Sequence, residues 1–145
     1  MTTTDAADPT PESIHAYILQ TFPDTIVAAI LGGTFYSVDP KNSPNFATVV
    51  TSDAFDRASN LSRDGVFRLN IGLNRDTFDR LVGDVPADDT TDYTVLDTLL
   101  PHPDYARQHY VSILNPSAAT FEELIRPLLD EAHARVRWQY DRHRS

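Results

Sequence analysis

The sequence predicts an α+β domain, a two-layer sandwich in which the N- and C-terminal helices pack on one face of an antiparallel sheet of about five strands. Three observations lead to this prediction. Apolar residues recur at helical spacing near both ends of the chain, and short β-branched and aromatic runs lie between them. The connections between those runs are short, which favours antiparallel neighbours. The length of 145 residues fits one domain.

The expected domain spans residues 10–140, between a flexible leader at 1–9 and a basic tail at 141–145. Its first helix should begin after Thr10, a good N-cap residue, with Pro11 at the first helical position. Pro23 should close it. The apolar stripe consists of Ile14, Tyr17, Ile18 and Phe22.

Three short strands are expected next, at residues 25–30, 34–38 and 46–51. The pair Gly32-Gly33 predicts a hairpin turn, because glycine adopts positive φ at no steric cost. Residues 52–65 are polar, and we interpret them as a turn-rich excursion.

Residues 66–71 form the clearest strand of the sequence. Strand alternation places Phe67, Leu69 and Ile71 on one face, with Val66, Arg68 and Asn70 on the other. If Arg68 is solvated, its replacement by alanine should cost much less stability than that of Phe67.

The second half of the chain should hold a short helix, a last strand and a long helix. Asn74 is the expected cap of the short helix, and Gly83 follows its end. Residues 84–92 form an acidic loop, residues 93–100 fit either a strand or a short helix, and residues 109–114 form the last strand. The long helix should begin near a capping box of Thr120 and Glu123, carry the stripe Ile125, Leu128, Leu129, Ala132 and Val136, and be interrupted at Pro127.

Composition excludes several function classes. The chain has no cysteine, so disulfides and thiolate chemistry are removed. The formal net charge of −9 repels phosphate backbones and makes nucleic acid an unexpected partner. No apolar run is long enough to cross a bilayer and the first residues do not resemble a signal peptide, so we expect a cytoplasmic protein without a membrane partner. The basic residues are nearly all arginine, which we interpret as the coding bias of a GC-rich bacterial genome.

Several segments resemble a known bacterial family. They are Phe46-Ala47-Thr48-Val49-Val50-Thr51, Gly65-Val66-Phe67-Arg68-Leu69-Asn70-Ile71-Gly72, Pro101-His102-Pro103 and Leu114-Asn115-Pro116-Ser117, and in this order they resemble the domain of unknown function 6194. Residues 67–82 and 103–134 are also loosely similar to the MmcQ/YjbR-like proteins, although His109-Tyr110 stands where that family has a basic residue, His and Trp. The resemblance implies an α+β fold and supplies no catalytic residues.

The candidate site is the polar face of the strand at residues 66–71. Arg68 and Asn70 could hold a small polar or anionic ligand, with His109 as a proton carrier and with Tyr36, Tyr105 and Tyr110 as walls. Two alternatives stay open for Arg68. It is either solvated or paired with an acid such as Asp53 or Asp56. His102, between two prolines, is interpreted as structural.

We expect no metal and no cofactor. Asp88, Thr90 and Asp92 alternate like the start of a calcium loop, but Tyr93 and Leu99 stand where such a loop needs glycine and glutamate. No phosphate-binding loop, zinc-protease motif or nucleophile elbow is present.

The sequence leaves the function unknown, with two classes open. It favours a non-catalytic binding or adaptor module, and leans away from an enzyme. The alternative is a small-ligand sensor or enzyme that uses Arg68, Asn70 and His109. The expected partner is an unknown protein or a small polar or anionic ligand, and the chain is expected to be a monomer or homodimer. A pocket of a few hundred Å³ that contains Arg68 and Asn70 would favour the ligand, and a flat sheet face the adaptor.

Overall fold

The structure is a computed structural model that describes residues 7–41 and 44–144. Within these residues, six strands form one antiparallel sheet in the order β1-β2-β3-β4-β6-β5. The strands are β1 (Ile26–Ile30), β2 (Gly33–Ser37), β3 (Ala47–Val50), β4 (Arg68–Gly72), β5 (Leu100–Pro101) and β6 (Tyr110–Leu114). The predicted antiparallel sheet is confirmed. The short β5 is the strand beyond the five expected, and it begins at the last residue of the segment 93–100 that fitted either a strand or a helix.

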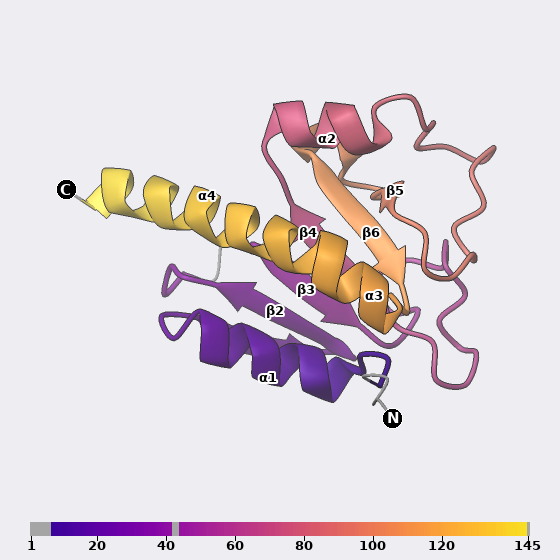
Figure 1. The fold of residues 1–145 in the computed structure, drawn as a ribbon, viewed down its shortest axis with the longest axis horizontal. Helices are drawn as coiled ribbons and strands as arrows, with labels where there is room; N and C mark the ends of the chain where they lie inside the picture. The colour runs from indigo at the N-terminus through magenta and orange to yellow at the C-terminus, as the bar shows by residue number, and fades with distance from the viewer. Residues whose placement is uncertain (1–6, 42–43, 145) are drawn as a thin grey trace.

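The helices form the second layer. They are α1 (Pro11–Thr21), α2 (Arg75–Val82) and the C-terminal run of α3 (Ala118–Thr120) and α4 (Arg126–Arg144). Figure 1 shows α1 and α4 on the same side of the sheet, so the predicted two-layer α+β sandwich is confirmed. No helix in the described part of the chain is both long and apolar enough to cross a membrane.

The first helix starts where its cap residue predicts. The Ser13 amide donates to Thr10 Oγ1 at 3.1 Å, and the Thr10 amide donates to Ser13 Oγ at 2.8 Å, which together make a capping box. Ile14 and Ile18 are fully buried against the sheet. Reciprocal capping and one apolar stripe therefore fix both the start and the orientation of α1.

The first hairpin turns at Leu31 and Gly32, which have φ of 53° and 83°. Ile30 pairs with Gly33, so these two residues form the whole loop. Positive φ at both central positions is the signature of a type I′ turn. The predicted hairpin is confirmed, shifted by one residue, since Gly33 opens β2 instead of belonging to the turn.

The C-terminal helical run begins earlier than Thr120. Ser117 is the N-cap, and its Oγ accepts from the Thr120 amide at 3.2 Å, while Thr120 itself has helical dihedrals and no cap bond. The predicted capping box at Thr120 is therefore wrong. The run then passes through a π-helical turn at Phe121–Ile125, in which the Arg126 amide donates to the Phe121 carbonyl. This irregularity directly precedes Pro127, where the sequence predicts an interruption.

The main core lies between the sheet and the helices. The residues predicted for the buried stripe of the last helix all belong to it: Ile125, Leu128, Leu129, Ala132 and Val136. The other side of the sheet is covered by the two long connections, β3–β4 and α2–β5. Beneath them lies a group of buried polar side chains: Ser59, Arg68, Asn70, His102 and Ser112. The loops therefore bury most of this polar face.

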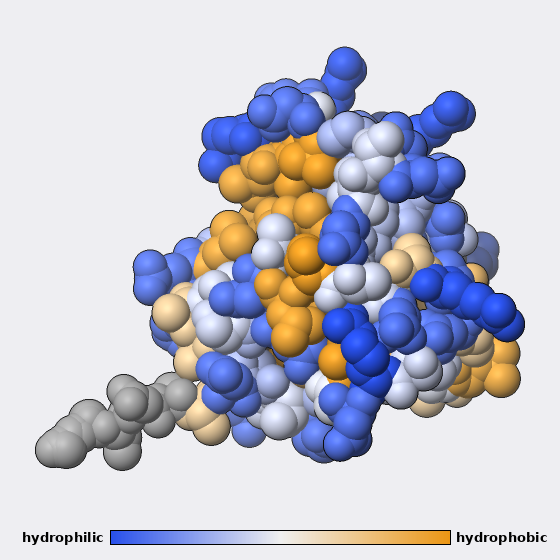
Figure 2. All heavy atoms as spheres, turned by 90° about the vertical axis from the view of Figure 1, so that its right-hand side faces the viewer, coloured by the Kyte–Doolittle hydropathy of each residue, from blue (hydrophilic) through white to orange (hydrophobic). Residues whose placement is uncertain are grey.

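Hydrophilic residues predominate on the face drawn in Figure 2, but hydrophobic residues also gather on it. Figure 2 shows a band of hydrophobic residues through the upper and central part of the side that lies to the right in Figure 1. The α2–β5 connection runs along that side (Figure 1), and it carries Val95 and Leu96, which are 37% and 48% exposed. This connection therefore adds exposed apolar surface to the molecule.

Candidate ligand-binding cavity

Strand β4 separates apolar from polar side chains as its alternation predicts. Phe67, Leu69 and Ile71 belong to the core under the helices, and Arg68 and Asn70 lie on the opposite face. β4 is an interior strand with β3 on one side and β6 on the other. Arg68 is 2% exposed and Asn70 4% exposed, so both polar side chains are buried. A group buried this deeply requires partners.

Arg68 finds its partner in the β3–β4 connection. Its Nη2 lies 2.6 Å from Asp56 Oδ2 and its Nη1 lies 2.9 Å from Asp56 Oδ1, a bidentate ion pair. The hydrogen bonds from Arg68 lower the pKa of Asp56 although burial opposes this shift. The expectation of a paired Arg68 is thus confirmed with Asp56, because Asp53 instead accepts from the Leu61 amide at 2.8 Å. The alternative of a solvated Arg68 is wrong, and the small stability cost of replacing it stays a prediction.

One N–H group of the Arg68 guanidinium has no hydrogen-bond partner. Nη1 also donates to Ser59 Oγ at 3.1 Å, but Nε is buried and has no hydrogen-bond partner. An unpaired buried donor is costly, and in native proteins it calls for an explanation. Arg68 therefore keeps one donor without a partner on the polar face.

Asn70 is held by its two neighbours across the sheet. β3 aligns Thr48 with Asn70, and β6 aligns Ser112 with it. Asn70 Nδ2 donates to Thr48 Oγ1 at 2.7 Å, and Ser112 Oγ donates to Asn70 Oδ1 at 2.7 Å. The three side chains form a polar rung that fixes the orientation of the amide.

A cavity of about 350 Å³ lies over this rung. Its walls combine aromatic rings with polar side chains. The aromatic members are Phe35, Phe55, Tyr105 and Tyr110, and the polar members are Asn45, Thr48, Asp56, Arg68, Asn70, His102 and Asp104. The volume lies within the range of sites for small molecules. Tyr105 is 55% exposed, so the cavity opens to solvent at its rim.

His102 is a member of this site that the sequence did not assign. Its Nδ1 accepts from the backbone amides of Asp104 at 2.9 Å and Tyr105 at 3.1 Å, which supports the structural role that was expected. Burial, assisted by the charge of Arg68, lowers the pKa of His102 to about 4. The ring is therefore neutral at pH 7 and carries its proton on Nε2, a second donor in the lining.

Tyr110 lines the cavity, and its ring contacts Gly72 of the neighbouring strand. The Tyr110 hydroxyl donates to the Asn45 carbonyl at 2.6 Å, and Gly72 is paired with Tyr110 across β4 and β6. A Cβ atom on Gly72 would lie 2.9 Å from the tyrosine ring, so the absence of a side chain lets the ring lie flat against the strand. Gly72 was not among the residues expected at the site.

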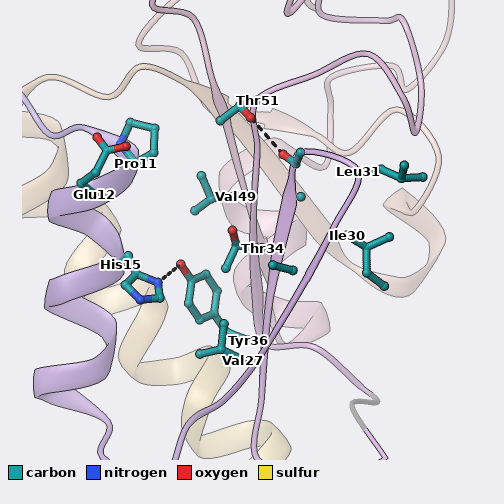
Figure 3. Close-up of a pocket in the computed structure, with 13 residues that line it drawn as sticks. Pro11, Glu12, His15, Val27, Ile30, Leu31, Thr34, Tyr36, Val49 and Thr51 are labelled. Carbon is teal, nitrogen blue, oxygen red and sulfur yellow. Dashed lines mark hydrogen bonds between the residues drawn. The ribbon is translucent and has the colours of Figure 1, made fainter.

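Two of the predicted site residues lie elsewhere. Tyr36 faces the helices, where its hydroxyl lies 2.9 Å from His15 Nδ1 in a separate groove of about 610 Å³ beside α1 (Figure 3). Burial raises the pKa of Tyr36 to about 12. His109 has φ of 70° in the turn before β6, and its ring packs on Phe78. The structure thus brings Arg68, Asn70 and Tyr105 together and leaves Tyr36 and His109 outside the cavity lining.

Carboxylates of the acidic loop accept hydrogen bonds from backbone amides two residues further along the chain. Asp88 Oδ1 accepts from the Thr90 amide and Asp92 Oδ1 accepts from the Thr94 amide, each at 2.9 Å. These bonds hold turns within the loop. No group of three or more His, Cys, Asp or Glu side chains among residues 7–41 and 44–144 is arranged to hold a metal ion.

Comparison with known proteins identifies the family. The sequence profile described as "Family of unknown function (DUF6194)" matches residues 9–145. The chain belongs to this family. The function of this family is unknown. No curated protein matches the chain, and no solved structure matches it.

Proposed function

We propose that the protein is a small-molecule-binding module and that its ligand site is the cavity over Arg68 and Asn70. The sequence left an adaptor and a ligand binder open, with a pocket around these two residues as the distinguishing feature. A cavity of about 350 Å³ at that place supports the ligand binder. The single observation that carries the proposal is Arg68 itself, which lines the cavity, is 2% exposed, and keeps an unpartnered Nε.

We propose binding without catalysis. The nearest imidazole, that of His102, has its Nδ1 lone pair occupied by two backbone amides, and its pKa is held at about 4. A general base needs a free lone pair and a pKa near the working pH. His109, the proton carrier expected from the sequence, does not line the cavity. These features support a sensor or carrier over an enzyme.

A fragment screen by ligand-observed NMR tests the proposal when it is repeated on two matched variants. Thr48→Met fills the cavity, and Thr34→Met adds the same side chain on the groove of Figure 3. Both threonines are half-buried strand residues, but they lie on opposite faces of the sheet. We expect the fragment hits of the wild type to persist in Thr34→Met and to disappear in Thr48→Met. If both variants retain all hits, the cavity is not the ligand site.

A second candidate function, the protein-binding module, is favoured by the apolar band of Figure 2. Val95 and Leu96 supply exposed apolar surface on that side, on a connection that also covers the sheet. Large exposed apolar patches mark interaction sites. Leu96→Asp should abolish capture of a protein partner while leaving fragment binding at the cavity unchanged. Loss of both would show that the substitution disturbs the fold.

The broader assignments from the sequence remain proposals. A relationship to the MmcQ/YjbR-like proteins is supported by the loose similarity of residues 67–82 and 103–134, and by a strand-helix unit at β4 and α2. A bacterial source is supported by the arginine-rich usage of basic residues. A cytoplasmic location is retained as a proposal only. We also retain the proposal that residues 10–140 form a single domain.

A further inference from the structure

Resting on the proposed function, we propose a ligand class for the cavity: a small organic cation, an amine or quaternary ammonium with an apolar body and a neutral oxygen acceptor. The sequence alone suggested a small polar or anionic ligand held by the guanidinium of Arg68 and the amide of Asn70. The contacts of Arg68 argue against the anion.

The positive charge of Arg68 is already neutralised. Asp56 binds both terminal nitrogens, at 2.6 and 2.9 Å, and the low pKa of Asp56 keeps that carboxylate ionised. An anionic ligand would have to displace a bidentate partner that is attached to the same chain, or approach its negative charge. The free Nε of Arg68 can still donate one hydrogen bond, which a neutral hydroxyl or carbonyl oxygen satisfies.

The remaining charge of the lining is negative. Among the described lining residues, only Asp56, Arg68 and Asp104 carry formal charges at pH 7, since His102 is neutral. Two carboxylates and one guanidinium leave one net negative charge, which is that of Asp104. The chain as a whole carries −9, so its field attracts cations and repels anions.

The aromatic residues suit an ammonium group. Tyr105 and Tyr110 lie edge to face at 6.5 Å between ring centroids, and Phe35 and Phe55 at 5.5 Å. All four rings line the same cavity as Asp104. Aromatic faces attract ammonium ions, and clusters of such rings are the usual recognition device for quaternary ammonium ligands.

An acceptor without a hydrogen-bond partner also fits an amine ligand. Asn45 Oδ1 is buried without a hydrogen-bond partner, although the backbone carbonyl of the same residue receives the Tyr110 hydroxyl. An N–H group of a bound amine would satisfy this oxygen. Acceptors at Asn45 and Asp104 and donors at Arg68 and His102 define a ligand with one cationic and one oxygen-bearing end.

The test uses three probes of matched size: benzylamine, benzyl alcohol and benzoate. ¹H–¹⁵N spectra of the full chain are titrated with each probe, and shifts are followed at the backbone amides of Asn70, Asp104 and Tyr105. We expect benzylamine to bind at least about tenfold more tightly than benzyl alcohol, and benzoate to cause no shift at these positions. Raising the salt concentration should weaken benzylamine alone, because screening acts on the charge.

Two variants localise the charge effect. Asp104→Asn should weaken benzylamine several-fold and leave benzyl alcohol unchanged, whereas Asp88→Asn, on the acidic loop outside the lining, should change neither. Tight binding of benzoate, or no shift with benzylamine, overturns the ligand class. A different result, the persistence of all fragment hits in Thr48→Met, would contradict the proposed function. The two failures are therefore distinguishable.

Discussion

Asp56 and Arg68 are joined by two hydrogen bonds, of 2.6 and 2.9 Å, across the buried polar face of the sheet. One residue belongs to a loop and the other to an interior strand, so the ion pair fastens the β3–β4 connection over β4. The exposed fractions of their side chains, 14% and 2%, place the pair largely out of water. The same contact thus lines the cavity and neutralises the charge of Arg68 within it.

Removal of one partner of this ion pair should be strongly destabilising. Asp56→Ala leaves the guanidinium buried without a counter-charge, and we expect a loss of about 3–5 kcal/mol in the free energy of unfolding. Asp56→Ala combined with Arg68→Met should recover much of this loss, because no charge is then buried. Urea unfolding measures both. Glu122→Ala, which breaks the exposed pair with Arg126, is the control and should cost less than about 0.5 kcal/mol. Equal losses for the two single variants would mean that the Asp56 pair is solvated.

The contact between Gly72 and Tyr110 gives a second prediction. Gly72→Ala places a Cβ atom 2.9 Å from a ring that is held by its hydroxyl at the Asn45 carbonyl. We expect a cost of about 1–3 kcal/mol from overpacking. In a Tyr110→Ala background the obstacle is gone, and the same substitution should be neutral or slightly stabilising. A double-mutant cycle by urea unfolding measures the coupling, and additive costs would refute the contact.

Local patterns predicted much of the fold because each depends on neighbouring residues. The Thr10 N-cap of α1 and the alternation of β4 both follow from spacing within one element. The helix stripe at Ile125, Leu129 and Val136 depends on the same kind of regularity. Where two cap residues compete a few positions apart, as Ser117 and Thr120 do, spacing alone does not decide between them.

The cavity could be predicted only in part. Arg68 and Asn70 come from a strand whose two faces differ clearly in polarity, so the sequence could place them. Tyr36 follows Phe35, and with aromatic residues on both faces of β2 the sequence does not show which one faces the helices. Asp56 and His102 reach the site from irregular loops, which have no periodicity to indicate their direction.

The start of the C-terminal helical run can be tested by two alanine substitutions. Ser117→Ala removes the oxygen that accepts from the Thr120 amide, and it should cost about 1 kcal/mol in the free energy of unfolding. Thr120→Ala replaces a residue that already has helical dihedrals by a better helix former, so we expect little change. Thermal or urea unfolding of both variants measures the ranking. The opposite ranking would favour the capping box at Thr120 that the sequence suggested.

The buried, neutral His102 should make stability depend on pH in a definite window. The pKa of His102 falls from an ordinary value of 6.5 to about 4 on folding. Between these pH values the imidazole is protonated in the unfolded chain and neutral in the folded chain. Stability is therefore complete above pH 6.5 and falls as the pH drops toward 4, by at most about 3 kcal/mol. The low pKa of Asp56 acts only below this window, because a carboxylate of lowered pKa loses its contribution to stability as the pH falls below the ordinary value of 3.8.

His102→Asn provides the control, since an asparagine oxygen can accept from the same two amides without titrating. Urea unfolding at pH 7.5, 6.5, 5.5 and 4.5 should show a steeper decline for the wild type than for His102→Asn, and parallel declines would place the titrating group elsewhere.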